Sequence, residues 1–382
     1  MSRHRRQLLA AALSASLWPR LARPQASGSE ATSQPALTKR PLQFPRDLGS
    51  HPDTAIEWWY ITGELQAKNR LFGFQLTFFR SRVPSTQTMR SAFAAKQLIF
   101  AHAAVTDVTG QRLLHDQRLA RSSGQASVDL ASASEQDTRV NLRDWSLVHA
   151  ADGSYLAQAS GKEFALTLTL NETQPLLLQG DQGLSRKGPQ PAQASYYYSL
   201  PQLQVSGELT LAGIATPVTG RAWLDHEWSQ SLMPPQAVGW DWMGMNLNDG
   251  GALTAFRLRD KAGATVWAGG SWRANGTTKP VIFLPEEVDF KAVRLWESPA
   301  SGAIYPVQWT IGLPTTGLDA SPATASSRRY TVQALVDNQE LDSRSSTGAI
   351  YWEGLSDLHN EQGQTIGRGY LEMTGYASPL KL

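Results

Sequence analysis

The sequence has no cysteine among its 382 residues, which excludes disulfide frameworks, thiolate zinc sites, iron–sulfur clusters and cysteine nucleophiles. It also lacks a P-loop, a dinucleotide-binding fingerprint and the Gly-x-Ser-x-Gly motif of many serine hydrolases. Beyond the N-terminal region, no apolar run approaches the roughly 20 residues that a membrane-spanning helix needs. The body of the chain is therefore predicted to be soluble, without a familiar nucleotide or acyl-transfer site.

The chain carries little net charge, and that charge is unevenly distributed. Lys and Arg number 35 against 33 Asp and Glu. Five of the arginines and none of the acids fall within residues 1–26, so the remainder has 30 basic and 33 acidic residues, a net charge of −3. A mildly acidic body argues against a nucleic-acid partner. Tryptophan, in contrast, is abundant, with 13 residues, which indicates a need for large rigid aromatic surface.

Residues 1–26 have the pattern of an export signal. Met1–Gln7 is basic, and Leu8–Trp18 is an apolar run too short to span a bilayer as a stable helix. Arg5 to Leu9 (RRQLL) resembles the twin-arginine pattern, which directs folded proteins across the membrane. Residues 27–39 form a polar linker. We predict export to the periplasm or cell envelope, with a retained N-terminal anchor as the alternative.

The body alternates apolar and polar residues with the period of a β-strand. Phe72–Phe78 and Phe164–Leu170 place every second side chain on an apolar face. Turn dipeptides such as Asp152-Gly153 and Asn275-Gly276 separate such stretches. No long segment outside the signal has a helical period. Many short strands with regular turns predict an all-β barrel or sandwich.

An internal comparison suggests that the β-structure occurs twice. When Trp58 is placed over Trp240 without gaps, Leu65 falls on Leu247, Leu71 on Leu253, Phe74 on Phe256 and Leu76 on Leu258. Sequence rich in Gly, Pro and Gln over residues 180–194 separates the two strand-rich halves. We therefore predict an N-terminal β-domain at 40–200 and a C-terminal β-domain at 201–382.

Several blocks, in order, resemble a known family. The blocks are HPDTAIEWWYITG at 51–63, FGFQLTFFR at 72–80, YYYS at 196–199, GRAWLDHEW at 220–228, GWDW at 239–242, YP at 305–306, YWEG at 351–354 and GYLEMTGY at 369–376. The chain is thereby similar to the AttH-like proteins, which are related to the carotenoid 1,2-hydratases (CrtC), over roughly residues 40–378. The resemblance implies two tandem lipocalin-like antiparallel β-barrels. In the hydratase branch it implies acid-catalysed addition of water to a C=C bond without a metal or cofactor, and His226-x-Trp228 resembles part of that branch's active site.

The densest group of ionisable residues lies between Trp223 and Trp228. In a strand, Asp225 and Glu227 share one face, and His226 and Trp228 share the other. A carboxylic acid kept protonated by an apolar wall can protonate an alkene, and tryptophan faces can stabilise the resulting cation. The alternative is a structural ion-pair network around the same acids.

The short loop after Trp228 suggests a partner for this group. Loops of this length bring their flanking strands together, so we expect Asp225–Trp228 to face Trp240–Trp242 across a pocket at the domain interface. Asp225, His226 and Asp241 are the candidate catalytic residues, and either aspartate is a candidate for the acid.

Further aromatic groups are His51–Trp59, which contains acids, the three tyrosines Tyr196–Tyr198 at the domain junction, and the late segments Tyr351–Glu353 and Tyr370–Glu372. Candidate substrate-binding residues there and in the groups above are Glu57, Trp58, Trp228, Trp240, Trp242 and Tyr197. Core packing is the alternative for the tryptophans, and domain sealing is the alternative for the tyrosine. Tyr351–Glu353 and Tyr370–Glu372 are interpreted as barrel walls with solvated acids. No ligand-pair spacing supports a metal site, so none is predicted.

Two functions remain open from the sequence. An eight-stranded barrel can hold one small ligand, which favours a binding protein for an apolar small molecule, a lipid or an isoprenoid, with an envelope transporter complex as a further partner. The alternative is a cofactor-free hydratase, isomerase or cyclase that acts on an isoprenoid C=C bond. The two differ in whether the candidate acids converge on one apolar cavity.

Overall fold

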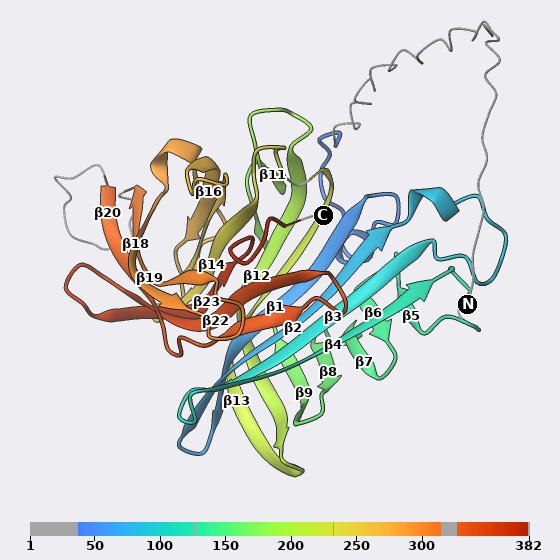
Figure 1. The fold of residues 1–382 in the computed structure, drawn as a ribbon, viewed down its shortest axis with the longest axis horizontal. Coiled ribbons are helices and arrows are strands. Elements are labelled where there is room, and N and C mark those ends of the chain that lie inside the picture. Colours follow the sequence, from blue (N-terminus) through green and yellow to red (C-terminus); the bar gives the residue numbers. More distant parts are fainter. Residues whose placement is uncertain (1–36, 126, 232, 315–326, 381–382) are drawn as a thin grey trace, which may run out of the picture. The chain divides into compact units, whose positions relative to one another are not determined.

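The structure, a computed structural model, consists almost entirely of antiparallel strands (Figure 1). It describes residues 37–125, 127–231, 233–314 and 327–380, so the predicted export signal and most of the linker lie outside the described residues. All of these described residues belong to one compact unit. No helix within the described ranges is long and apolar enough to cross a membrane. The helical turns there are η1 (Arg46–Leu48), η2 (Pro84–Thr86) and η3 (Pro285–Glu287).

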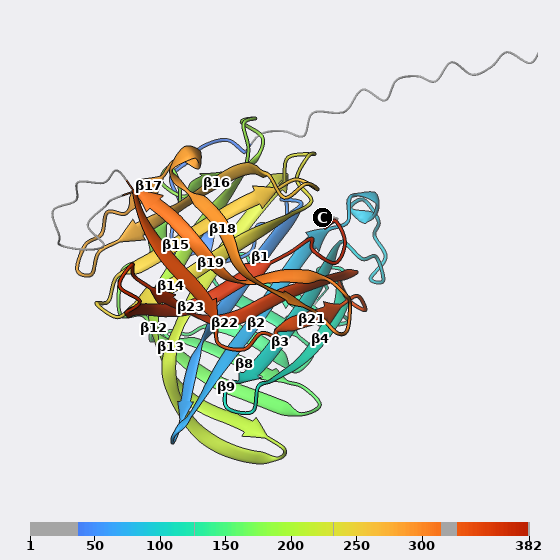
Figure 2. The same cartoon turned by 60° about the vertical axis from the view of Figure 1, so that its left-hand side comes forward.

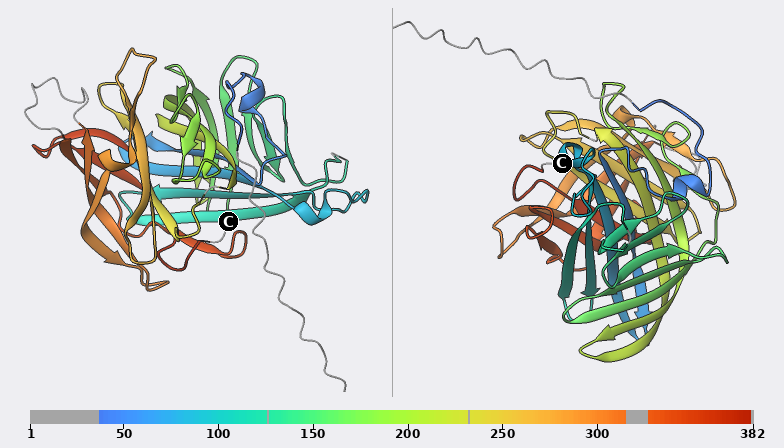
Figure 3. Two further views of the ribbon diagram at one scale, coloured as in Figure 1. Left: turned by 90° about the horizontal axis from the view of Figure 1, so that it is seen from above. Right: turned by 90° about the vertical axis from the view of Figure 1, so that its right-hand side faces the viewer.

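The first sheet has thirteen strands among the described residues, and it curls until β4 lies near β5 (Figure 3). Its order is β4-β3-β2-β1-β13-β12-β9-β8-β7-β6-β5, with β10 and β11 paired to β12. The strands are β1 (Ile56–Ala67), β2 (Arg70–Arg82), β3 (Gln97–Asp107), β4 (Arg112–Ser122), β5 (Ala131–Ala133), β6 (Arg139–Leu142), β7 (Trp145–His149), β8 (Tyr155–Ser160), β9 (Phe164–Asn171), β10 (Leu177–Leu178), β11 (Leu184–Arg186), β12 (Ala194–Leu211) and β13 (Ile214–Ser231).

The second sheet has ten strands among the described residues, in the order β17-β16-β15-β14-β23-β22-β20-β19-β18, with β21 paired to β22. The strands are β14 (Gly239–Leu247), β15 (Ala252–Arg259), β16 (Thr265–Arg273), β17 (Val281–Phe283), β18 (Asp289–Glu297), β19 (Ile304–Pro314), β20 (Ser327–Ala334), β21 (Glu340–Ser343), β22 (Ala349–His359) and β23 (Thr365–Met373). The prediction of an all-β fold built from two antiparallel β-structures is confirmed, and one sheet is nearly barrel-shaped.

The two sheets pack against each other, and Figure 2 shows β22 and β23 beside β1 and β2. Trp59 points into the core of the first sheet, whereas Tyr60, the next residue on β1, packs in the layer between the sheets. Strands at this contact are therefore buried on both faces, because successive side chains point in opposite directions. The backbones approach closely: a Cβ at Gly73 would lie 2.6 Å from the Tyr370 hydroxyl.

The repeat seen in the sequence holds for the first strand of each hairpin but not for the second. Trp58 and Trp240 both line the space between the sheets. Trp58 lies opposite Phe79 on β2, whereas Trp240 lies opposite Leu258 on β15, so the second hairpin is three residues shorter. An odd difference in register exchanges the two faces of a strand. Accordingly, the aligned pair of Phe74 and Phe256 packs in different cores.

The chain crosses from the first sheet to the second later than the predicted domain boundary between residues 200 and 201. Those residues fall inside β12, which forms a long hairpin with β13, and β13 pairs with β1. The first sheet thus continues to Ser231, and the second begins at Gly239. The predicted boundary was placed next to the segment 180–194, but part of that segment forms β11, which is paired to β12.

Candidate functional site

A cavity of about 250 Å³ lies between the two sheets. Its walls come from the outward faces of both sheets and from four residues outside the strands, Lys187, Thr347, Thr374 and Leu380. The main side chains are Trp58 and Tyr60 of β1, Phe79 of β2, Phe100 and His102 of β3, Tyr197 of β12, Asp225 and Glu227 of β13, Trp240 and Trp242 of β14, Phe256 and Leu258 of β15, Tyr351 and Glu353 of β22, and Glu372 of β23. Aromatic and aliphatic surface dominates this set, with carboxyl groups interspersed.

Glu353 and Glu372 form a pair of acids in this cavity. They lie directly opposite each other on β22 and β23. Glu353 is only 2% exposed, and among the described residues neither of its carboxyl oxygens makes a hydrogen bond of ordinary geometry, although the Tyr60 hydroxyl lies beside it. Burial and the neighbouring Glu372 raise the pKa of Glu353 well above its usual range. Burial raises the pKa of Glu372 to about 7, and the nearby carboxyls of Asp225 and Glu227 act in the same direction. Both acids therefore favour the protonated form.

Asp225 contributes a third acid, which is held by hydrogen bonds. It accepts bonds from Tyr197 Oη at 2.6 Å, Ser199 Oγ at 2.5 Å and Trp223 Nε1 at 2.6 Å. Burial nevertheless raises the pKa of Asp225 to about 7, because these bonds only partly offset the loss of hydration. Trp242 Nε1 donates to Tyr197 Oη at 3.2 Å and so links this group to the second sheet.

Glu227 is the fourth acid, and it has a cationic partner. Lys187 Nζ lies 3.0 Å from its carboxylate, and Ser195 donates a short hydrogen bond to it. The same ammonium lies 4.8 Å from the ring centroid of Tyr197 and 4.2 Å from that of Phe256. Such distances permit cation–π attraction. The cavity therefore already holds one ammonium group against its aromatic wall.

His102 supports Tyr351 at the wall formed by β3 and β22. Its Nδ1 lies 2.7 Å from the Tyr351 hydroxyl, and its Nε2 lies 2.9 Å from Ser346 Oγ. Burial lowers the pKa of His102 to about 3, so the imidazole is neutral at ordinary pH. The pair holds the Tyr351 ring in place without adding charge to the cavity.

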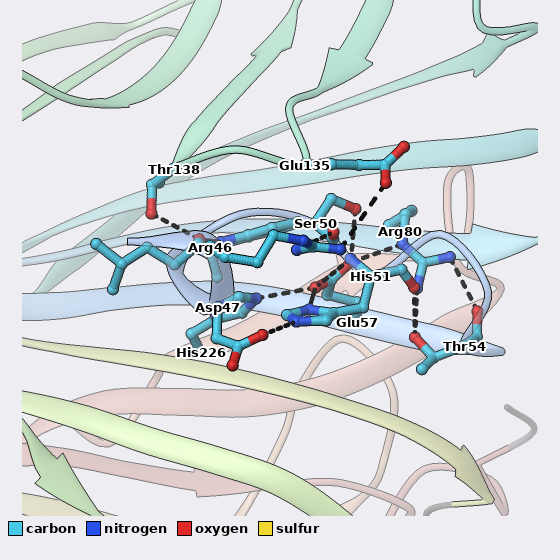
Figure 4. Close-up of polar contacts among 12 residues, drawn as sticks. Arg46, Asp47, Ser50, His51, Thr54, Glu57, Arg80, Glu135, Thr138 and His226 are labelled. Carbon is cyan, nitrogen blue, oxygen red and sulfur yellow. Dashed lines mark hydrogen bonds and ion pairs between the residues drawn. The ribbon is translucent and has the colours of Figure 1, made fainter. Parts of the chain in front are cut away.

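His226 and Glu57 point away from the cavity, into the first barrel (Figure 4). His226 Nε2 and His51 Nδ1 lie 3.0 Å and 2.8 Å from Glu57 Oε1, and Arg80 Nε lies 2.7 Å from Glu57 Oε2. Burial alone would raise the pKa of Glu57, but the two histidines and Arg80 hold it well below its usual range. Burial lowers the pKa of His226 to about 4, against the pull of Glu57. Trp228 faces the same way, stacked on His51 with ring centroids 3.8 Å apart.

His51, Glu57 and His226 are the residue types of a zinc site, and their donor atoms lie within 4.8 Å of one another. Their hydrogen bonds already account for each donor and acceptor. The Glu57 carboxylate accepts from Arg80, Ser50 and the His51 backbone as well as from both rings. His51 Nε2 faces Asp47 Oδ1 at 3.0 Å. This arrangement fits a buried ion-pair network that is complete without an ion.

Asp241 lies on the core side of the second sheet, away from the other candidate acids. Its carboxylate is 2.7 Å from Arg257 Nε and 2.9 Å from the Tyr376 hydroxyl. The expected convergence of Asp225, His226 and Asp241 therefore does not occur. Trp240 and Trp242 point into the cavity, so alternation turns Asp241 to the opposite face.

The structure brings five predicted residues to the cavity through their side chains: Asp225, Tyr197, Trp58, Trp240 and Trp242. Glu57 also borders the cavity, but its carboxylate points away from it, into the first barrel. Glu353, Glu372 and Lys187 were missed as functional residues. The interpretation of Glu353 as a solvated acid is wrong, because β22 is buried on both faces. One signal was present: Tyr351–Leu355 (YWEGL) offers no run of polar positions for a wet face.

Comparisons with known proteins agree with this architecture. The AttH-like family profile matches residues 35–376. The crystal structure of a candidate AttH from Nitrosomonas europaea is 43% identical, with a TM-score of 0.79, over 90% of this chain and 99% of that one. Kievitone hydratase from Nectria haematococca is 13% identical, with a TM-score of 0.63, over 91% and 95% of the two chains, and shares the fold. A search of curated proteins by sequence gives no match.

Proposed function

The chain belongs to the AttH-like family, and we propose that it binds a small apolar molecule between its two sheets and protonates a C=C bond of that molecule. The reaction class is that of a cofactor-free hydratase or isomerase. One observation carries this proposal: Glu353 presents a buried carboxyl without a hydrogen-bond partner to an aromatic cavity, directly opposite a second acid. A fold shared with a kievitone hydratase is consistent with the proposed chemistry.

The chemistry follows from the protonation state of the pair. A neutral Glu353 carboxyl transfers its proton to one alkene carbon and becomes a carboxylate, while positive charge develops on the other carbon. The carboxylate and the faces of Trp58, Trp240 and Trp242 stabilise that charge. Addition of water forms the C–O bond, and the proton that the water releases returns to the carboxylate pair. Loss of a different proton from the cation would instead isomerise the alkene.

The cavity volume limits the substrate. An apolar cavity of about 150 Å³ takes up benzene, so the space of about 250 Å³ here suits a molecule of one or two rings or a short isoprenoid. The carotenoid substrate of the hydratase branch is much longer than this. Carriage of such a molecule without chemistry is the second candidate function, favoured by the predominantly aromatic and aliphatic walls.

Deuterium transfer from D2O tests the proposal. We would incubate the protein with 4-vinylphenol and with geraniol, and follow deuterium incorporation and water addition by mass spectrometry. The wild type is expected to label at least one probe, and Glu353→Gln to reduce the rate by roughly 10² to 10⁴, the usual effect of removing a general acid. Glu208→Gln, an exposed acid on β12, is the matched control. Binding of both probes without any transfer would leave a carrier instead.

A further inference from the structure

The Glu353–Glu372 pair has no cation of its own. Lys187 is engaged with Glu227 at the cavity wall, and Arg80 is engaged with Glu57 in the first barrel. Glu353 has no ion-pair partner among the residues that the structure describes, and the nearby Tyr60 hydroxyl, also unpartnered, does not reach ordinary hydrogen-bond geometry with its carboxyl. A buried polar group left without a partner costs free energy and calls for an explanation. A ligand that supplies the missing partner is one such explanation.

The charged groups that line the cavity indicate whether such a ligand is a cation or an anion. The carboxyl groups of Asp225, Glu227, Glu353 and Glu372 line it together with the Lys187 ammonium, and Glu57 and Arg80, which also border it, pair with each other in the first barrel. His102 faces it as a neutral ring, because burial lowers the pKa of this histidine to about 3. With the pair protonated, Lys187 balances Glu227, so an anion finds no free positive charge, whereas a cation gains a counter-charge as soon as the pair gives up a proton. The charged and titratable groups that face the pair are Tyr60 of β1, His102 of β3, Lys187, Tyr197 of β12, Asp225 and Glu227 of β13, Tyr351 of β22 and Tyr370 of β23.

The walls suit a cation that carries apolar groups. Trp58, Trp240 and Trp242 line the space beside the acids, and aromatic faces attract ammonium groups through the ring quadrupole. Lys187 shows this within the same cavity, since its ammonium lies 4.2 Å from the Phe256 ring centroid. A small hydrated metal ion, in contrast, would find few oxygen ligands on such a surface.

We propose that the cavity is a binding site for a small organic cation, a substituted ammonium bearing one ring, which binds against Glu353 and Glu372 and displaces a proton from them. The inference deepens the proposed function, because an ammonium imitates the positive charge of a protonated alkene. It does not require that the chemistry take place. Proton and ligand compete for the same pair, so the cation binds more tightly as the pH rises.

Calorimetry with phenyltrimethylammonium and its neutral isostere, tert-butylbenzene, tests this inference on the full chain. At pH 8 the cation is expected to bind at least tenfold more tightly than the isostere, and tenfold more tightly than it does at pH 6. Titrations in two buffers of different ionisation enthalpy should show proton release. Glu353→Gln should weaken the cation at least tenfold and leave the isostere unchanged, with Glu208→Gln as the control.

Equal or tighter binding of the neutral isostere would overturn the inference, and so would full cation affinity in a folded Glu353→Gln variant. If that variant does not fold, Glu372→Gln replaces it, with the same expectation. The outcomes separate the two proposals. Proton transfer to an alkene without cation binding removes only this inference, whereas cation binding without proton transfer removes only the proposed chemistry.

Discussion

Asp225 and His226 are neighbours in sequence but serve different parts of the molecule. Asp225 faces the cavity between the sheets, and His226 is fully buried in the first barrel, where it bonds Glu57 and Tyr198. Asp225 therefore belongs to the candidate site, whereas His226 stabilises the first barrel. Substitution of each should therefore change a different property.

We predict that His226→Ala destabilises the protein by about 3 kcal/mol, because Glu57 and Tyr198 each lose a buried hydrogen bond. Asp225→Asn should cost about 1 kcal/mol, because the amide oxygen still accepts from Ser199 and Trp223. The measurement is urea denaturation at pH 6, with cation binding measured in parallel. Asp225→Asn should weaken binding, and His226→Ala should not while the protein stays folded. The reverse order of stability losses would contradict the assignment.

At the scale of the strand, the alternation of apolar and polar residues correctly predicted several strands and their faces. The expected strands at 72–78 and 164–170 lie within β2 and β9. The expected faces of β13 also hold, with Asp225 and Glu227 on one side and His226 on the other. Such faces follow from the backbone alone, since side chains of a strand alternate strictly.

The alternation of apolar and polar residues could not predict whether a given face of a strand packs against the other sheet or meets solvent. The acids at Glu353 and Glu372 were expected in solvent because one face of an antiparallel sheet is often wet. The second sheet packs that face against the first, which buries Glu353 and leaves Glu372 half-buried. Asp241 was misplaced for a different reason: a face shared with Trp240 and Trp242 is excluded by alternation itself. A pairing between distant strands was therefore needed to place the two glutamates but not Asp241.

At the scale of the whole molecule, the candidate site belongs to neither sheet alone. The first sheet supplies Asp225 and the Lys187–Glu227 pair, and the second supplies Glu353 and Glu372. Each sheet keeps its own apolar core on the opposite face. The candidate site is thus confined to the layer where the two sheets meet, and the cores of both sheets are filled by packing and ion pairs.

Export remains a proposal from residues 1–26, which lie outside the described part of the chain. We expect delivery to the periplasm through the twin-arginine route, because Arg5 and Arg6 precede a weakly apolar run. Replacement of both arginines by lysine should retain the protein in the cytoplasmic fraction, as detected by cell fractionation and immunoblotting. Unchanged delivery by that variant would reject this route.

The central claim, a neutral Glu353 between the sheets, has a consequence for stability. A carboxyl whose folded pKa is raised contributes stability below its unfolded pKa and loses it as the pH rises through the folded value. Glu353, Glu372 and Asp225 behave in this way. Glu57, whose pKa is lowered, contributes above its unfolded pKa and loses that contribution as the pH falls. The pH dependence of the wild type is the sum of these contributions, and a variant that removes one carboxyl group isolates the contribution of that group.

The most direct measurement is therefore the free energy of unfolding of the wild type and of Glu353→Gln at pH 5 and pH 8. The account predicts that the variant gains stability relative to the wild type as the pH rises, by about 1.4 kcal/mol for each pH unit between the unfolded and folded pKa of Glu353. Glu208→Gln should show no such gain. A difference between variant and wild type that stays constant, or falls, from pH 5 to pH 8 would mean that Glu353 is ionised in the folded protein and would contradict the account.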